Sequence, residues 1–135
     1  MISRLSAVAV VLSGFVSVAA YADDDWTGLY AAIHPGDGSL DHLSIVPAGG
    51  GTYDFLLSTE RLGLCDGGPG WAAGTLARSG RALEVQEETV SCADGSDAAT
   101  PPGFRLTFFD DDDVLLIEPL TGDSGGFHFH RISAD

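Results

Sequence analysis

The sequence predicts an all-β protein, a single eight-stranded antiparallel up-and-down barrel with one disulfide. Short runs of alternating apolar and polar residues recur along the chain, and no long window places apolar residues at helical spacing. Clusters of Gly, Asp, Ser and Pro separate these runs, as expected for turns between antiparallel strands. Closing the sheet into a barrel also removes the unpaired edges through which strands aggregate.

Residues 1–22 have the features of a secretory signal peptide. One cation, Arg4, precedes an apolar stretch, and the small residues Ala20 and Ala22 match the A-x-A cleavage pattern. An acidic run follows, without the basic flank that would stop transfer of a membrane anchor. We therefore expect cleavage after Ala22, a single β-barrel domain over residues 23–135, and no stable membrane insertion of the mature chain.

Composition narrows the possible partners and the location. The chain carries 6 Lys+Arg against 20 Asp+Glu, a formal net charge of −14. Such an acidic protein lacks the basic surface that nucleic-acid binding requires, and anionic membranes repel it. There is no Asn for N-glycosylation and no Lys, which favours a bacterial protein that is periplasmic or secreted.

Cys65 and Cys92 are the only cysteines, and the oxidising compartment favours a disulfide between them. A bridge closing a loop of this length contributes about 3.5 kcal/mol in the chain-entropy model. Two isolated cysteines make a poor zinc site, and the sequence has no C-x-x-C redox pair. The predicted role is structural.

Eight runs are the predicted strands. In chain order they are Trp26–Ile33, His42–Pro47, Thr52–Thr59, Trp71–Arg78, Leu83–Cys92, Phe104–Phe109, Val114–Glu118 and Phe127–Ile132. The alternation of the fifth run changes phase at Glu87 and Glu88, which predicts a β-bulge there. The acids Glu84, Glu87 and Glu88 are expected on the outer face of the sheet.

The first and last predicted strands carry a pattern seen in one family of barrels. Period-two alternation puts Trp26, Gly28 and Tyr30 on one face, and Arg131 on the inner face of the last strand. In these residues and in its strand layout the chain resembles calycin-like barrels, the superfamily of lipocalins and fatty-acid-binding proteins. The first strand of those barrels carries a G-x-W element, and an Arg from near the end of the chain packs over its Trp. Gly28-x-Tyr30 stands in that place, with Tyr instead of Trp.

The resemblance implies a structural cluster at a closed barrel end and a mouth for a small apolar ligand at the other. If a ligand enters, its candidate contacts are the inward aromatic residues Tyr53, Phe55, Phe104 and Phe108. Small inward residues such as Gly74 either leave a cavity or accommodate neighbouring rings, and the sequence leaves both alternatives open.

The string at Gly122–Gly126 looks like the nucleophile loop of chymotrypsin-like serine proteases. Those enzymes need two barrels, and this chain is long enough for one. Their loop also continues with Pro, where this chain has Phe127. Catalysis would further require a base and an acid converging on Ser124. We interpret the string as a hairpin turn and predict no enzymatic activity.

No metal or cofactor is assigned. His128 and His130 lie two residues apart on one predicted strand, a spacing that can hold a metal. The inner face of that strand is better filled by its aromatic residues, which places both histidines outside. The acidic run Asp110–Asp113 is expected at a solvated hairpin tip, because four adjacent acids repel one another. It does not match an EF-hand loop, because Leu115 occupies the position where that loop requires Gly.

Two function classes follow, with a third kept as a further alternative. The first is an exported binding barrel that holds a small apolar ligand. The second is a periplasmic or secreted protein-binding module, such as an inhibitor of a hydrolase. Its negative charge would favour a basic secreted partner such as a lysozyme. The third is a metal-binding periplasmic protein.

Overall fold

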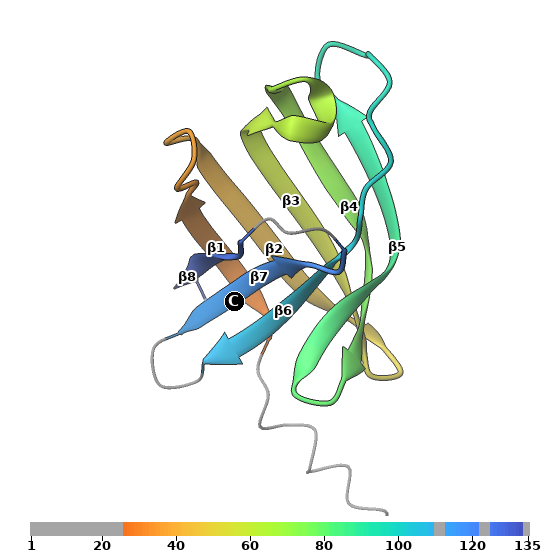
Figure 1. Cartoon of the computed structure of the whole chain (residues 1–135). Coiled ribbons are helices and arrows are strands. Elements are labelled where there is room, and N and C mark those ends of the chain that lie inside the picture. Colours follow the sequence, from red (N-terminus) through yellow and green to blue (C-terminus); the bar gives the residue numbers. More distant parts are fainter. Residues whose placement is uncertain (1–25, 110–112, 122–124, 134–135) are drawn as a thin grey trace, which may run out of the picture.

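The computed structural model describes residues 26–109, 113–121 and 125–133 and confirms the closed eight-stranded antiparallel barrel (Figure 1). Each strand pairs with its neighbours in sequence, and the last pairs with the first. The strands are β1 (Gly28–Ile33), β2 (Leu40–Gly49), β3 (Thr52–Leu62), β4 (Gly68–Ser79), β5 (Ala82–Cys92), β6 (Phe104–Phe109), β7 (Val114–Pro119) and β8 (Phe127–Ser133). A short 3-10 turn, η2 (Gly63–Cys65), connects β3 to β4.

Every predicted strand is present, and the largest differences lie where β3 meets β4. Both strands extend past the predicted runs, and their pairing continues to Leu62 opposite Gly68. The sequence around Pro69 is rich in Gly and shows no alternation, so the predicted run begins only at Trp71. Pairing with a neighbour extends the strand where the side-chain pattern gives no signal.

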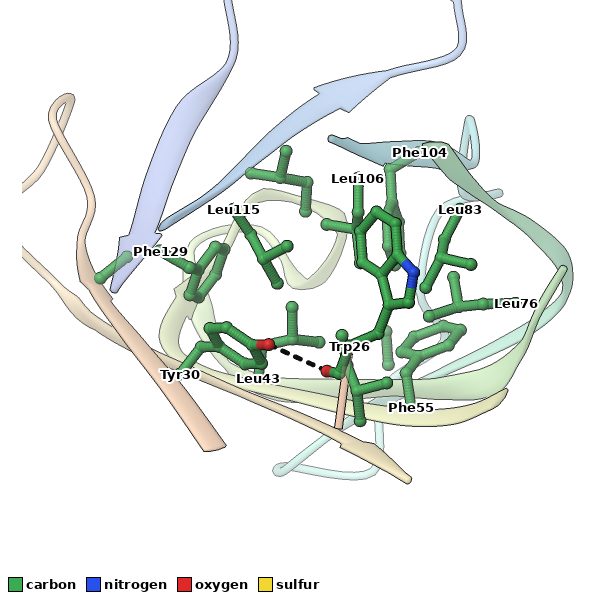
Figure 2. Close-up of a cluster of buried hydrophobic side chains, with 14 residues drawn as sticks. Trp26, Tyr30, Leu43, Phe55, Leu76, Leu83, Phe104, Leu106, Leu115 and Phe129 are labelled. Atoms are coloured by element: carbon green, nitrogen blue, oxygen red, sulfur yellow. Dashed lines mark hydrogen bonds between the residues drawn. The ribbon is translucent and has the colours of Figure 1, made fainter. Parts of the chain in front are cut away.

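The barrel interior is an apolar core formed by alternate residues of the strands. Most of its fully buried large side chains are labelled in Figure 2, where they converge. The full set is Trp26, Tyr30, Leu43, Ile45, Leu76, Leu83, Leu106, Leu115 and Phe129. Rings from different walls also contact one another. Phe55 of β3 meets Phe104 of β6 edge to face, with centroids 5.1 Å apart. Side chains therefore fill this part of the barrel, as the diameter of eight strands allows.

A β-bulge lies in β5, beside the predicted position. Thr75 pairs with Glu87 and Leu76 pairs with Val85, which leaves Gln86 as the extra residue. The bulge brings the Glu87 carbonyl into the space that a side chain at position 74 would occupy, and Gly74 leaves that space free. Gly74 is required for this close approach of two backbones rather than for a cavity.

The predicted disulfide between Cys65 and Cys92 is confirmed, with a Cα–Cα distance of 5.5 Å. It ties η2 to the last residue of β5. The chain after Cys92 follows the same end of the barrel, where the Ala99 N–H donates to the Leu64 carbonyl over 2.9 Å. The bridge thus holds the β3–β4 connection against the long β5–β6 connection.

The barrel wall is least regular between β5 and β6. These strands pair only from Ala82 to Glu84 on β5, against Arg105 to Thr107 on β6. Beyond Glu84 the two strands diverge, as Figure 1 shows, and β5 continues for eight more residues to Cys92. The second half of β5 therefore pairs with β4 alone.

Replacing Gly74 with Ala is expected to destabilise the fold, because the new methyl group would collide with the Glu87 carbonyl. The free energy of unfolding should fall by about 1–3 kcal/mol, the usual cost of overpacking. Urea unfolding with the disulfide intact measures it. Gly63→Ala is the matched control, since its methyl group would meet nothing within 4 Å. An unchanged urea midpoint for Gly74→Ala would show that the two backbones do not meet here.

Candidate functional site

The structure brings the predicted cluster together at the barrel end where β1 begins. Trp26, Gly28 and Tyr30 are all buried on the inner side. The Tyr30 hydroxyl donates a 2.9 Å hydrogen bond to the Trp26 carbonyl, drawn as a dashed line in Figure 2. The Trp26 ring lies 5.5 Å from the ring of Phe108, centroid to centroid. These rings close the end of the barrel.

Arg131 covers this aromatic cluster. Its guanidinium lies 5.1 Å from the ring centroids of both Tyr30 and Phe108, which is a cation–π geometry. One Nη1–H donates to the Thr27 carbonyl over 2.7 Å, and Nε lies 3.2 Å from the Asp113 carboxylate. The side chain is only 8% exposed. Arg131 therefore packs over Tyr30 and joins β8 to the start of β1.

The four aromatic residues expected to contact a ligand are already in contact with other side chains. Phe55 and Phe104 are buried and pack on each other, and Phe108 packs against Trp26. Tyr53 is partly buried against the same core. These contacts favour a barrel interior that is filled by its own side chains.

Glu88 lies inside the barrel, which corrects the outer position expected from the sequence. The bulge at Gln86 shifts the alternation, so that Glu88 follows Val85 on the inner face. Its Oε2 is buried and has no hydrogen-bond partner among the residues that the structure describes. Burial raises the pKa of this carboxyl, because desolvation disfavours the charged form. A polar group without a partner destabilises the fold.

A second buried carboxyl lies at the opposite end of the barrel from Trp26. Asp41 of β2 is buried, and its Oδ1 likewise lacks a partner among the described residues. Burial raises the pKa of Asp41, and a hydrogen bond with Thr59 opposes the shift. Nearby, the Ser39 N–H donates to Asp37 over 2.8 Å and stabilises the β1–β2 turn. The barrel interior therefore holds two carboxyls that are destabilising when ionised.

His128 and His130 are exposed on the outer face of β8. They border two shallow surface hollows. One, of about 470 Å3, also includes Ile33 of β1, and the other, of about 350 Å3, includes Phe109 and Val114. Among the described residues, no three His, Cys, Asp or Glu side chains lie close enough together to hold a metal ion.

Several sequence predictions fall outside the described residues. These are the signal peptide over residues 1–22, the acids Asp110–Asp112, and Ser124 in the Gly122–Gly126 string. Among the described helical segments, none is long and apolar enough to cross a membrane.

Sequence reasoning missed two features of the surface and the interior. Glu88 faces inward because the extra residue of the bulge is Gln86. The change of phase in the sequence indicated a bulge but did not identify the extra residue. The outer wall formed by β6, β7, β8 and β1 combines residues that are distant in the chain, so no local pattern predicted it.

Comparisons with models of known protein families, with curated proteins and with solved structures find no match to this chain. The resemblance to calycin-like barrels therefore depends on the strand layout and the residues around Tyr30 and Arg131.

Replacing Arg131 with Met is expected to destabilise the barrel, because Met keeps the apolar length and loses the charged hydrogen bonds. The cost should be about 1.5–3 kcal/mol of unfolding free energy, as for hydrogen bonds to charged groups. Denaturant titration measures it. Arg105→Met is the control, since Arg105 makes an exposed pair with Glu84 at 3.1 Å and such pairs contribute about 0–1 kcal/mol. Equal losses in both variants would contradict the structural role of Arg131.

Glu88→Gln is expected to stabilise the protein at neutral pH and to flatten its stability profile. A carboxyl whose pKa is raised in the folded state holds its proton more tightly there than in the unfolded chain. Stability is therefore lost as the pH rises above the ordinary value of 4.5 toward the raised pKa. Thermal unfolding from acidic to neutral pH measures the loss. Glu87→Gln, at an exposed residue of the same bulge, removes an equal charge. Identical profiles for both variants would contradict the burial of Glu88.

Proposed function

We propose that this chain is a non-enzymatic, exported binding barrel that recognises another protein through its outer surface. The main support for this proposal is the filled interior, in which rings from different walls contact one another. Phe55 meets Phe104, and Trp26 meets Phe108, at the positions where a ligand would have to lie. A barrel filled by its own side chains binds through its outside and its loops.

Charge supports a partner of opposite sign. At a formal net charge of −14, the chain would attract a basic protein over a distance and raise its rate of association. An inhibitor of a basic secreted hydrolase is one protein of this type. The disulfide Cys65–Cys92 suits a small scaffold that presents a rigid surface outside the cytoplasm.

The second candidate is the small apolar ligand, favoured by the wall between β5 and β6. Past Glu84 these strands are unpaired, and the inward side chains Val85 and Val90 are only partly buried. A ligand that separates the diverging strands would reach the interior there. Glu88 disfavours a wholly apolar ligand, since its buried oxygen would stay without a partner.

Native mass spectrometry of the protein purified without detergent from the cells that produce it discriminates the two candidates. We expect the oxidised chain without a small-molecule adduct, and a discrete protein retained by the tagged chain at physiological salt. An adduct of a few hundred daltons, or the absence of any retained protein, would contradict the proposal and favour the ligand-holding barrel.

A further inference from the structure

We propose that the outer wall of β6, β7, β8 and β1 is the docking surface for a basic protein; this inference rests on the proposed function. The wall carries a continuous uncharged band. The band consists of Ile33, Phe109, Val114, His128, His130 and Ile132. Phe109 pairs with Val114, Val114 with His130, and His130 with Ala31 of β1, so these residues are neighbours across four strands.

The band is more apolar than the outer surface of an antiparallel sheet usually is. Ile33 is 72% exposed, Ile132 57% and Phe109 44%. The outward side of an antiparallel sheet is ordinarily polar when the inward side forms the core. Contiguous exposed apolar surface on a soluble protein is typical of an interaction site.

The distribution of charge makes the band distinctive. Among the described outward-facing residues of the four strands, the charged ones are Arg105 of β6 and Glu118 of β7, which lie opposite each other at the other end of the β6–β7 pair from Phe109 and Val114. The chain has 20 Asp+Glu, so a wall of four strands with one outward carboxylate among its described residues carries less charge than expected for a surface in contact with water. Depletion of charge is typical of the centre of a protein interface.

Carboxylates border the band instead. Asp113 directly precedes Val114, Glu118 ends the outward row of β7, and Asp37 lies in the turn after Ile33. The Asp113 side chain is 64% exposed, although one of its oxygens already lies 3.2 Å from Arg131. Hydrogen bonding from Ser39 lowers the pKa of Asp37, which keeps that carboxylate charged. An apolar centre with an acidic border is complementary to an apolar patch with basic residues around it.

The acidic border of the band indicates which kind of partner could bind to this wall. A second copy of the chain related by a twofold axis would place one acidic border against the other, which is unfavourable. An anionic membrane would be repelled for the same reason. A basic protein gains both the apolar contact and the charge attraction. The hollows on either side of His128 and His130 offer places for its protruding side chains.

Site-specific photo-cross-linking in the producing cells tests this assignment. The photoreactive amino acid replaces Ile33 or Ile132 in the band. It replaces Leu56, an outward residue of β3 that is 48% exposed, as the control. We expect adducts with a protein of positive net charge from the two band positions, and none from position 56. Cross-links through Leu56 in equal yield, or adducts at the band with a second copy, a lipid or an acidic protein, would overturn the inference.

Matched substitutions test the energetics of the same surface. Ile33→Asp places a charge within the apolar band and should lower retention of the cross-linked protein by about tenfold or more. Leu56→Asp should leave retention unchanged. Both sites are exposed, and circular dichroism checks that each variant folds. If both variants retain the partner equally, the docking surface is elsewhere while the proposed function stands. If the unmodified chain retains no protein at all, the proposed function itself fails.

Discussion

Contact between rings from different walls of the barrel is the interaction on which the rest of the molecule depends. Phe55 and Phe104 meet in the interior, and Trp26 and Phe108 meet at the closed end under the guanidinium of Arg131. Eight strands enclose a space just wide enough for such side chains. Because these rings occupy the interior, a partner gains new contacts mainly at the outer surface. The disulfide connects chain segments at one end of this packed barrel, and Arg131 connects β8 to the start of β1 at the other end.

The bulge in β5 shows how one local irregularity affects both stability and shape. Gln86 is inserted opposite β4, the Glu87 carbonyl occupies the side-chain space of Gly74, and Glu88 turns inward. Bulges bend a strand and strengthen its twist. In this barrel the bulge lies just past Glu84, where β5 leaves β6. We infer that the bend directs β5 away from its neighbour, at the cost of one carboxyl oxygen buried without a described partner.

Charge is distributed unevenly around the barrel. The strands β6, β7, β8 and β1 present exposed apolar side chains and two histidines, Arg105 lies opposite Glu118 at one end of that wall, and further carboxylates lie at its border. The carboxylates would thus attract a basic partner over a distance, and the apolar side chains would make the short-range contacts. The same separation would disfavour self-association through this wall, because two copies facing each other would bring their acidic borders together.

The sequence by itself determined the number of strands, the inward aromatic residues and the disulfide. Period-two alternation is a local property of a strand packed on one side, and two cysteines allow a single pairing. Only the tertiary structure decided that β4 begins at Gly68, that Glu88 faces inward, and that Ile33 and Phe109 belong to one outer wall. Each of these depends on which strands pair and in which register. Pairing between distant segments is governed by closure of the whole barrel, which no local pattern of side chains contains.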